Sequence, residues 1–328
     1  MYSYHAICDG VGGLQFLADW LKVYNNIHHG NPVEHRLRKF EPQLLLHRNR
    51  LGYLKKKFLS HLFKQPVGLY GACKFIFRRA ENLTKNHSET ADWNNKSQPF
   101  IVGRWLDKTA SEKLIASALS KNVMLNALLL AHYFNHLHQW RMEKGSGDDK
   151  CWIRVIHPFN IRDYSDRRMT ATNRAAIVQI DRRPGPQDEF WKFTEALDRE
   201  IRIIDQWQLS KLFLLAIRGM SLVPGMLKRS ATSNKSRGTS VFTNLSESLS
   251  RMGLPTDESG LSAGNLTLEE FDLVGPIRQG TPLNMTIQQH LGRIRISLHV
   301  DPRVLSRAEA NLFIDSYATR LTGHAEQE

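Results

Sequence analysis

The most regular pattern of apolar and polar positions lies near the end of the chain. Between Arg293 and Val300, isoleucine, leucine and valine alternate with polar residues, which is the period of a strand with one buried face. A similar run over residues 283–291 precedes it, and Gly292 separates the two, so the pattern predicts a β-hairpin. Residues 151–157 and 174–181 are further apolar-rich runs, and we expect each to form a strand.

Helical spacing appears between and after these runs. Residues 125–140 place apolar side chains and two histidines on one helical face. Ser306 with Glu309 and Thr109 with Glu112 have the spacing of a capping box, and each pair predicts the start of a helix. Strands with helices between them indicate a mixed α/β or α+β fold.

The N-terminal pattern is short. Residues 2–8 are typical of the end of a buried strand, glycines within residues 10–13 predict a turn, and a helical pattern runs from Leu14. Glycines before a helix can also hold a phosphate, but the full Gly-x-Gly-x-x-Gly spacing is absent, so a turn is favoured.

A basic tract follows. Residues 36–80 carry twelve Lys and Arg against the single acid Glu41, with leucine and phenylalanine interleaved. This spacing predicts one or two amphipathic helices. Their basic face is either simply solvated or binds the surface of an anionic membrane. Residues 81–99 are polar and predict a linker. We therefore expect three parts: residues 1–30, the tract and linker at 31–99, and a second region at 100–328.

The net charge and the cysteines limit the possible binding partners and the cellular location. The formal net charge of +13 fits nucleic acid, an anionic membrane or acidic small molecules. The interleaved leucines favour a membrane surface, and we expect no nucleic-acid partner. Cys8, Cys73 and Cys151 form no C-x-x-C pair, which argues against a disulfide scaffold or zinc site. With no secretory signal at the N-terminus, we expect a cytoplasmic protein, peripheral to a membrane where the tract binds one.

The segment His5-Ala-Ile-Cys-Asp9-Gly10 carries the best candidate chemistry. A neutral imidazole in an enclosed site can take a proton from an attacking hydroxyl, amine or thiol. A carboxylate four residues later can anchor the turn that aims the ring, and a glycine permits a sharp exit into a helix. The short motif by itself is also compatible with an ordinary surface histidine.

This segment resembles the His-x-x-x-Asp-Gly motif of the chloramphenicol acetyltransferase-like superfamily, which includes condensation domains, wax ester synthases and alcohol acetyltransferases. The resemblance continues in order along the chain, at residues 122–131, 155–162, Asn173, 240–246 and 301–303. It implies a two-layer α/β sandwich built from two subdomains. Family members carry most of the first subdomain before this motif, so we expect that subdomain to be largely missing here.

The resemblance also implies roles for single residues. His5 is the expected general base. Asp9 and Gly10 are structural residues of the active site, and Arg162 is the expected partner of Asp9. Tyr4 stands where peptide-forming condensation domains have a further histidine, which weakens that specific activity.

The substrate side follows from the same resemblance. Ser240, Thr243 and Asn244 lie on the strand expected to line the substrate tunnel. The implied reaction moves an acyl group from a thioester, on coenzyme A or an acyl carrier protein, to a hydroxyl or amine, with no metal or redox cofactor. The alternative is a non-catalytic relative that binds a carrier protein or a membrane surface.

Two rival sites are weaker. Ser262 lies in a Gly-x-Ser-x-Gly sequence followed by Asp272 and His299 in hydrolase order, but loop-forming residues precede it instead of a buried strand. His132 and His136 have the i, i+4 spacing of a zinc pair without the glutamate of His-Glu-x-x-His, so core histidines are favoured.

Overall fold

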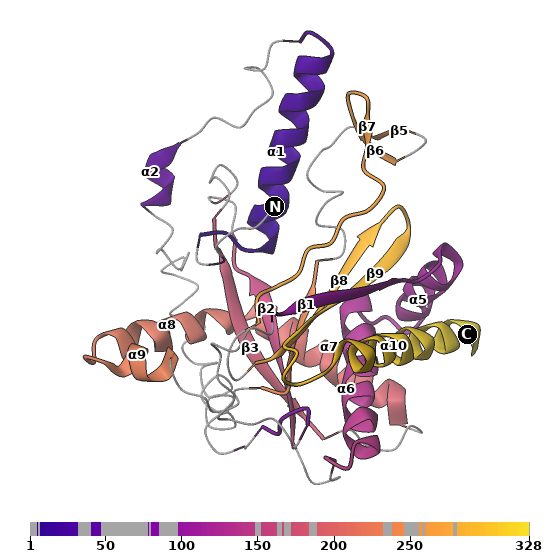
Figure 1. Ribbon diagram of the computed structural model, residues 1–328. Coiled ribbons are helices and arrows are strands. Elements are labelled where there is room, and N and C mark those ends of the chain that lie inside the picture. The colour runs from indigo at the N-terminus through magenta and orange to yellow at the C-terminus, as the bar shows by residue number, and fades with distance from the viewer. Residues whose placement is uncertain are drawn as a thin grey trace.

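The structure is a computed structural model, shown in Figure 1. It describes residues 5, 7–31, 41–46, 78, 80–84, 98–147, 152–162, 166, 172–183, 189–231, 238–245, 256–257, 260–277 and 281–327. Most of the basic tract at 36–80 therefore lies outside the described residues, apart from the short helix α2 (Pro42–Leu45) and a few single positions.

One six-stranded sheet organises the chain, in the order β1-β9-β8-β4-β2-β3. The strands are β1 (Phe100–Trp105), β2 (Ile153–Asn160), β3 (Ala175–Arg182), β4 (Ser240–Asn244), β8 (Leu283–His290) and β9 (Arg293–Val300). Strand β4 runs parallel to both of its neighbours, and the other pairs are antiparallel. The mixed α/β class predicted from the sequence is confirmed.

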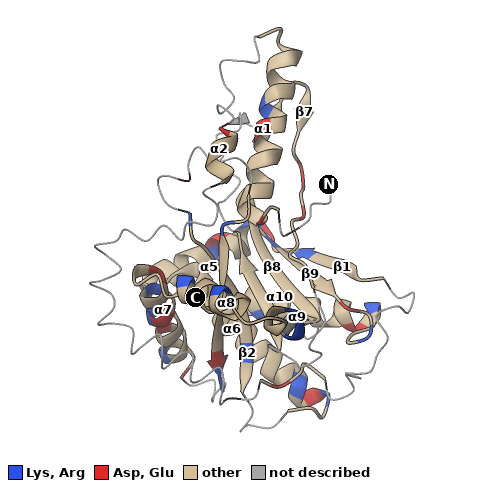
Figure 2. Cartoon of the chain, turned by 90° about the vertical axis from the view of Figure 1, so that its left-hand side faces the viewer, with Lys and Arg blue, Asp and Glu red and all other residues tan. Residues whose placement is uncertain are grey.

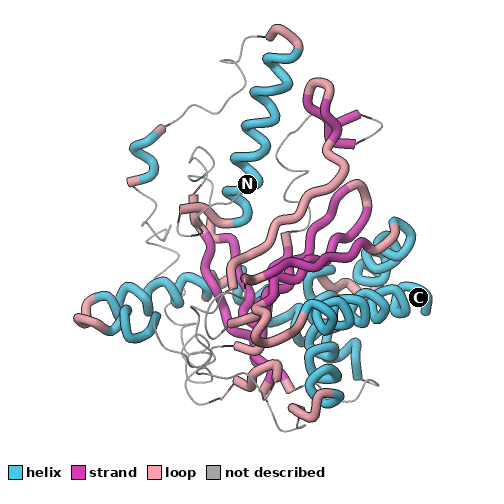
Figure 3. Tube along the Cα trace, in the orientation of Figure 1, coloured by secondary structure: helices cyan, strands magenta, loops and turns pink. Residues whose placement is uncertain are grey.

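Helices cover one face of this sheet (Figures 1 and 3). They are α5 (Lys108–Ser120), α6 (Leu125–Glu143), α7 (Phe190–Gln206) and α10 (Arg307–Gln327). The fully buried rings of Tyr133, Phe242 and Tyr317 pack between the helices and the sheet. Within the described residues no single helix is long and apolar enough to span a bilayer, although α5 and α6, bent by 106° at their junction, pass that test together by length and composition.

The opposite face of β8 and β9 is polar, and an extended segment crosses it. Gln288 pairs with both the backbone N–H and the carbonyl of Leu273, at 3.1 and 3.2 Å. The His299 ring lies 2.9 Å from the carbonyl of Gly275, and Arg295 forms an ion pair with Asp272. Gln288 and His299 of the sheet thus satisfy backbone groups of this segment, as polar groups removed from water require.

A smaller unit stands above the ends of the strands (Figure 1). It contains α1 (Gly10–His28) and the short strands β5 (Thr256–Asp257), β6 (Gly260–Ala263) and β7 (Leu266–Thr267). Leu14 and Ala18 of α1 pack against Leu261 in a second apolar cluster. The remaining helices, α8 (Ser210–Ser221) and α9 (Met226–Ala231), project from the side of the sheet where β3 lies.

Several local predictions are confirmed. The hairpin turns at Leu291 and Gly292, both with positive φ, and the expected strands of residues 151–157 and 174–181 correspond to β2 and β3. Ser306 and Glu309 form the reciprocal capping box, with bonds of 3.1 and 3.2 Å.

Two predictions of helix starts are wrong. Asp107, and not Thr109, caps α5, because its carboxylate accepts the N–H of Ala110 at 2.7 Å. Helix α1 begins at Gly10, and Asp9 caps it, so the glycines form the first helical turn instead of a separate turn. The division of the chain near residues 30 and 99 stays a prediction, although Leu83 of the expected linker is buried in the main core.

Candidate active site

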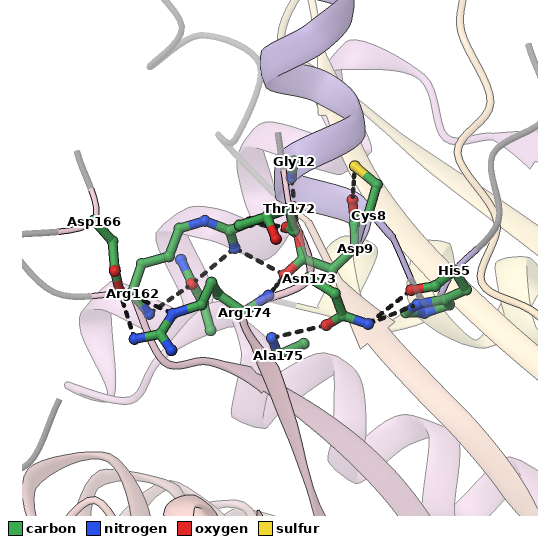
Figure 4. A network of polar contacts seen from close by, with 11 residues as sticks. His5, Cys8, Asp9, Gly12, Arg162, Asp166, Thr172, Asn173, Arg174 and Ala175 are labelled. Atoms are coloured by element: carbon green, nitrogen blue, oxygen red, sulfur yellow. Dashed lines mark hydrogen bonds and ion pairs between the residues drawn. The ribbon is translucent and has the colours of Figure 1, made fainter. Parts of the chain in front are cut away.

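The Asp9 carboxylate is the centre of a buried polar network at the start of α1 (Figure 4). Oδ1 accepts the N–H of Gly12 at 2.8 Å and Nη2 of Arg162 at 2.8 Å. Oδ2 accepts Nη1 of Arg162 at 2.9 Å and the backbone N–H of Arg174 at 2.7 Å. A carboxylate at this position stabilises a helix by capping it and by opposing its dipole. The pairing of Asp9 with Arg162 predicted from the sequence is confirmed.

Arg162 is held on its other side as well. Its Nη2 donates to the carbonyl of Thr172 at 2.6 Å, and Nη1 donates to Oδ1 of Asn160 at 3.2 Å. The side chain of Asp9 is 5% exposed and that of Arg162 is 14% exposed. Every carboxylate oxygen of Asp9 is therefore occupied by donors, and Asp9 holds the backbone together instead of facing a substrate.

A second ion pair, which the sequence did not reveal, lies behind the first. Arg174 donates to Oδ2 of Asp166 at 2.8 and 3.1 Å, and both side chains are buried. Two consecutive pairs thus connect α1 to the segments that flank β2 and β3. No signal in a single sequence couples Asp166 with Arg174, because both are ordinary charged residues of a loop.

His5 lies next to this network and is exposed. The Asn173 amide donates through Nδ2 to the carbonyl of His5 at 2.7 Å, and the same nitrogen lies 3.3 Å from Nδ1 of the ring. Oδ1 of Asn173 accepts the N–H of Ala175 at 3.2 Å, which sets the orientation of the amide. In Figure 4 the His5 ring lies to one side of Asn173 and the Asp9–Arg162 pair lies to the other. Asn173 therefore positions His5.

The backbone between His5 and α1 is tightly packed. A Cβ on Gly12 would lie 2.7 Å from the carbonyl oxygen of Thr172 and 2.8 Å from the Cys8 sulfur, so only glycine fits there. A Cβ on Gly10 would lie 3.1 Å from the side chain of Leu245, which follows β4. Burial raises the pKa of the Cys8 thiol to about 11, so this cysteine is a poor nucleophile at neutral pH. Since the Asp9 carboxylate occupies the start of α1, these glycines do not form a phosphate cradle.

Strand β4 brings the expected substrate residues to two different faces. Ser240 is fully buried, and its hydroxyl lies 2.6 Å from that of Tyr133 and donates to the carbonyl of Leu283 at 3.2 Å. This geometry gives Ser240 a packing role, and its position does not support substrate binding. By strand alternation, Asn244 follows Phe242 on the helix-covered face, whereas Thr243 lies on the face where Leu245 meets α1.

The rival sites are not assembled. Ser262 lies inside the hairpin strand β6 and pairs with Thr267, which is not a strand-to-helix elbow. Asp272 instead accepts from Arg295 and from the Ser297 hydroxyl. In the described part of the chain, no group of three or more His, Cys, Asp or Glu is placed to hold a metal ion.

Comparisons with known proteins agree on the fold. No family model matches the sequence, and no curated protein matches it. Among solved structures, the first condensation domain of the calcium-dependent antibiotic synthetase in complex with a substrate analogue matches with a TM-score of 0.62, at 15% identity over 98% of this chain. The epimerization domain from the third module of tyrocidine synthetase B matches with a TM-score of 0.64, at 13% identity over 99% of this chain. The condensation domain of the monacolin K polyketide synthase matches with a TM-score of 0.58, at 12% identity over 98%.

The chain thus has the fold of these condensation and epimerization domains, which is the fold that the resemblance drawn from the sequence implied. The match covers 63% of the first of these solved chains and 68% of the other two. The chain therefore spans about two thirds of the length of these structures.

Proposed function

We propose that this protein transfers an acyl group from a thioester to a hydroxyl or amine, with His5 as the general base. The observation that supports this most is the link between the Asp9–Arg162 pair and His5. The buried pair fixes the start of α1, and Asn173, which lies between Thr172 and Arg174 of that network, holds the exposed His5 beside it. The ring is exposed, and not enclosed as the motif led us to expect, and general-base catalysis requires it to lie within hydrogen-bond reach of the acceptor's proton.

In the proposed step, His5 carries one proton from the acceptor to the departing thiol. The acceptor O–H or N–H gives its proton to the His5 ring as its oxygen or nitrogen bonds to the thioester carbonyl carbon. The C–S bond then breaks, and the departing sulfur takes the proton back from the imidazolium. This reaction requires no metal ion and no redox cofactor. Thr243 lies on the face of β4 that α1 approaches, and we assign it to the lining of the substrate path.

The Asn173 contact bears on which ring nitrogen acts. Because Asn173 Nδ2 is a donor, Nδ1 of His5 accepts, and the neutral ring then carries its proton on Nε2. A ring in this state takes up a proton only at Nδ1. The ring must therefore turn from the amide for Nδ1 to act as the base, while the amide still holds the backbone carbonyl of His5.

The proposal also concerns the acyl donor, which is a thioester either on an acyl carrier protein or on coenzyme A. The solved neighbours include a condensation domain bound to a substrate analogue and domains of synthetases, which favours a thioester on an acyl carrier protein over acyl-CoA. The test follows the release of thiol from matched acyl-CoA and acyl-carrier substrates, with hydroxyl and amine acceptors. Faster release with the carrier substrate and an acceptor supports the proposal. Release that does not depend on any acceptor contradicts transfer.

A second candidate function is binding to an anionic membrane surface, without catalysis. The solved neighbours do not support it, but the tip between α8 and α9 does. Leu222 is 81% exposed and Val223 is 53% exposed, Met226 is exposed as well, and Arg218 and Arg229 lie on the adjoining helices (Figure 2). Apolar side chains flanked by cations are typical of interfacial segments.

Sedimentation with vesicles separates this candidate from the first. Binding should rise with the fraction of anionic lipid, fall with salt, and be lost in Leu222→Ser/Met226→Ser. Leu312→Ser is the matched control, because Leu312 is 62% exposed on α10. Equal sedimentation of the wild type with neutral and anionic vesicles would exclude this function. Equal sedimentation of Leu222→Ser/Met226→Ser and Leu312→Ser with anionic vesicles would exclude it as well. Acceptor-dependent thiol release by the wild type would also exclude this candidate, because it involves no catalysis.

A further inference from the structure

A groove of about 640 Å³ lies between α6, the start of α7 and α10. None of its lining residues belongs to the network around Asp9 and His5. The lining residues share one face of α6 and the facing side of α10, and the first turn of α7 closes one end. A groove of this volume is in the range of small-molecule sites.

The walls are aromatic. The His132 ring lies 4.5 Å from the ring of Phe190 and 4.7 Å from that of His324, measured between centroids. His324 lies in turn 5.5 Å from Trp191, and Trp140 lines the groove further along α6. These rings form a surface on which a planar group can stack.

Buried polar atoms in these walls have no protein partner. His132 is 5% exposed, and neither of its ring nitrogens has a hydrogen-bond partner. Nε2 of His136 and Nε1 of Trp140 are in the same state. Burial lowers the pKa of His136 to about 3 and lowers that of His132 well below its ordinary value, so both rings are neutral. A neutral imidazole offers one donor and one acceptor, and leaving both unused is costly.

Two opposite charges line the same groove without touching. The guanidinium of Arg320 donates to Oε1 of Gln139, and Nε2 of Gln139 donates to Oε1 of Glu143 at 2.8 Å. One amide thus separates a cation from a carboxylate. In the described part of the chain Arg320 forms no ion pair, and burial lowers the pKa of its guanidinium. A ligand that brings its own carboxylate would pair with Arg320, and a ligand ammonium would pair with Glu143.

We propose that this groove binds a small zwitterion with a planar ring, of the class of the aromatic amino acids. Its carboxylate pairs with Arg320, its ammonium group faces Glu143, and its ring lies against the aromatic wall near His132. This site is independent of the proposed acyl transfer, and loss of either function leaves the other intact.

Calorimetric titration of the full chain tests the proposal with three ligands. Phenylalanine carries both charges, 3-phenylpropanoate only the carboxylate, and phenethylamine only the ammonium group. Phenylalanine should bind at least about tenfold more tightly than either analogue, since each lost ion pair is worth roughly 1.4 kcal/mol or more. Equal affinity for all three ligands, or no saturable heat up to about 10 mM, would mean that water alone fills the groove, and it would overturn the proposal.

Variants assign the contacts. Arg320→Gln should weaken the binding of phenylalanine and 3-phenylpropanoate about tenfold and leave the binding of phenethylamine unchanged. Glu143→Gln should weaken the binding of phenylalanine and phenethylamine about tenfold and leave that of 3-phenylpropanoate unchanged. Arg199→Gln is the matched control, because Arg199 is exposed on α7 and does not line the groove. His132→Phe keeps an aromatic ring at this place in the wall, so it should fold and keep the affinity for phenylalanine. Binding of phenylalanine that is the same in Arg320→Gln as in Arg199→Gln would contradict the assignment.

Discussion

Asp9 and Arg162, 153 residues apart, form a two-point ion pair with N···O distances of 2.8 and 2.9 Å. The same carboxylate caps α1, and the same guanidinium binds the carbonyl of Thr172. The start of α1 is therefore attached to the segments that flank β2 and β3. The position of His5, four residues before Asp9, depends on this attachment.

Breaking the pair from one side should destabilise the fold. Asp9→Asn leaves the Arg162 charge buried without its partner, and Arg162→Met does the same to Asp9, so each should cost about 3–5 kcal/mol of unfolding free energy. The double variant should lose much less than the sum of the two. Urea unfolding of the four proteins measures this. Additive losses, or losses below about 1 kcal/mol, would show that the pair is not a buried anchor.

Gly12 and Gly13 form a matched test of the packing at the start of α1. Gly12→Ala places a Cβ 2.7 Å from the Thr172 carbonyl oxygen, so we expect a loss of roughly 1–3 kcal/mol. Gly13→Ala meets nothing closer than 4.0 Å, and alanine is the better helix residue, so it should be neutral or stabilising by about 0.5–1 kcal/mol. Thermal unfolding of both variants checks the difference in sign, and a similar shift in both would contradict the close approach.

Asn173→Ala should affect turnover more than stability. The half-buried amide of Asn173 holds the backbone carbonyl of His5 but takes no part in the Asp9–Arg162 pair, so its loss lets His5 shift without opening the buried network. Misplacement of a catalytic group by ~1 Å can cost about 10²-fold in rate. We expect a fall of about that size in acyl transfer, with a melting temperature close to that of the wild type. Unchanged turnover would remove Asn173 as the positioning residue.

His157 should make stability depend on pH. Its ring is buried between the Phe242 carbonyl, 2.8 Å from Nδ1, and the Asn126 amide, 3.1 Å from Nε2, and burial lowers its pKa to about 4. The unfolded chain takes up this proton near pH 6.5, so it binds more protons between about pH 6.5 and 4. Stability is therefore complete above that window and falls as the pH drops through it, by roughly 3 kcal/mol for this group.

The variant His157→Gln isolates this contribution, because glutamine stays neutral while offering a donor and an acceptor. Urea unfolding at pH 7 and pH 4.5 should show a smaller loss in the variant than in the wild type. His290→Gln is the control, since its ring is also bonded to a backbone carbonyl, that of Leu268. An equal pH dependence in wild type and His157→Gln would contradict the account.

The sequence predicted the elements whose signal is local. The β8–β9 hairpin follows from strict alternation around Gly292, and the start of α10 follows from the reciprocal bonds of Ser306 and Glu309. Thr109 failed as a cap because Asp107, two residues earlier, is the stronger acceptor for the free N–H groups of α5.

The site was predictable only in part, because its contacts are distant along the chain. The Asp9–Arg162 pair came from a family resemblance, whereas the Asp166–Arg174 pair has no sequence signal. Asn173 was noticed by its place in the resemblance, but its contact with His5 required the fold. Ser240 was expected to bind substrate but lies buried on the helix-covered face of β4, because alternation alone does not say which face the helices cover.

The central claim is that His5 is the base in acyl transfer, and a rate comparison tests it most directly. Thiol release from an acyl-carrier thioester is measured with a saturating acceptor for the wild type, His5→Ala and His29→Ala. His29 is an exposed histidine at the other end of α1, so its loss should leave turnover unchanged. The account predicts that His5→Ala loses about 10²–10⁴-fold in rate while keeping the wild-type melting temperature. Turnover of His5→Ala equal to that of His29→Ala would contradict it.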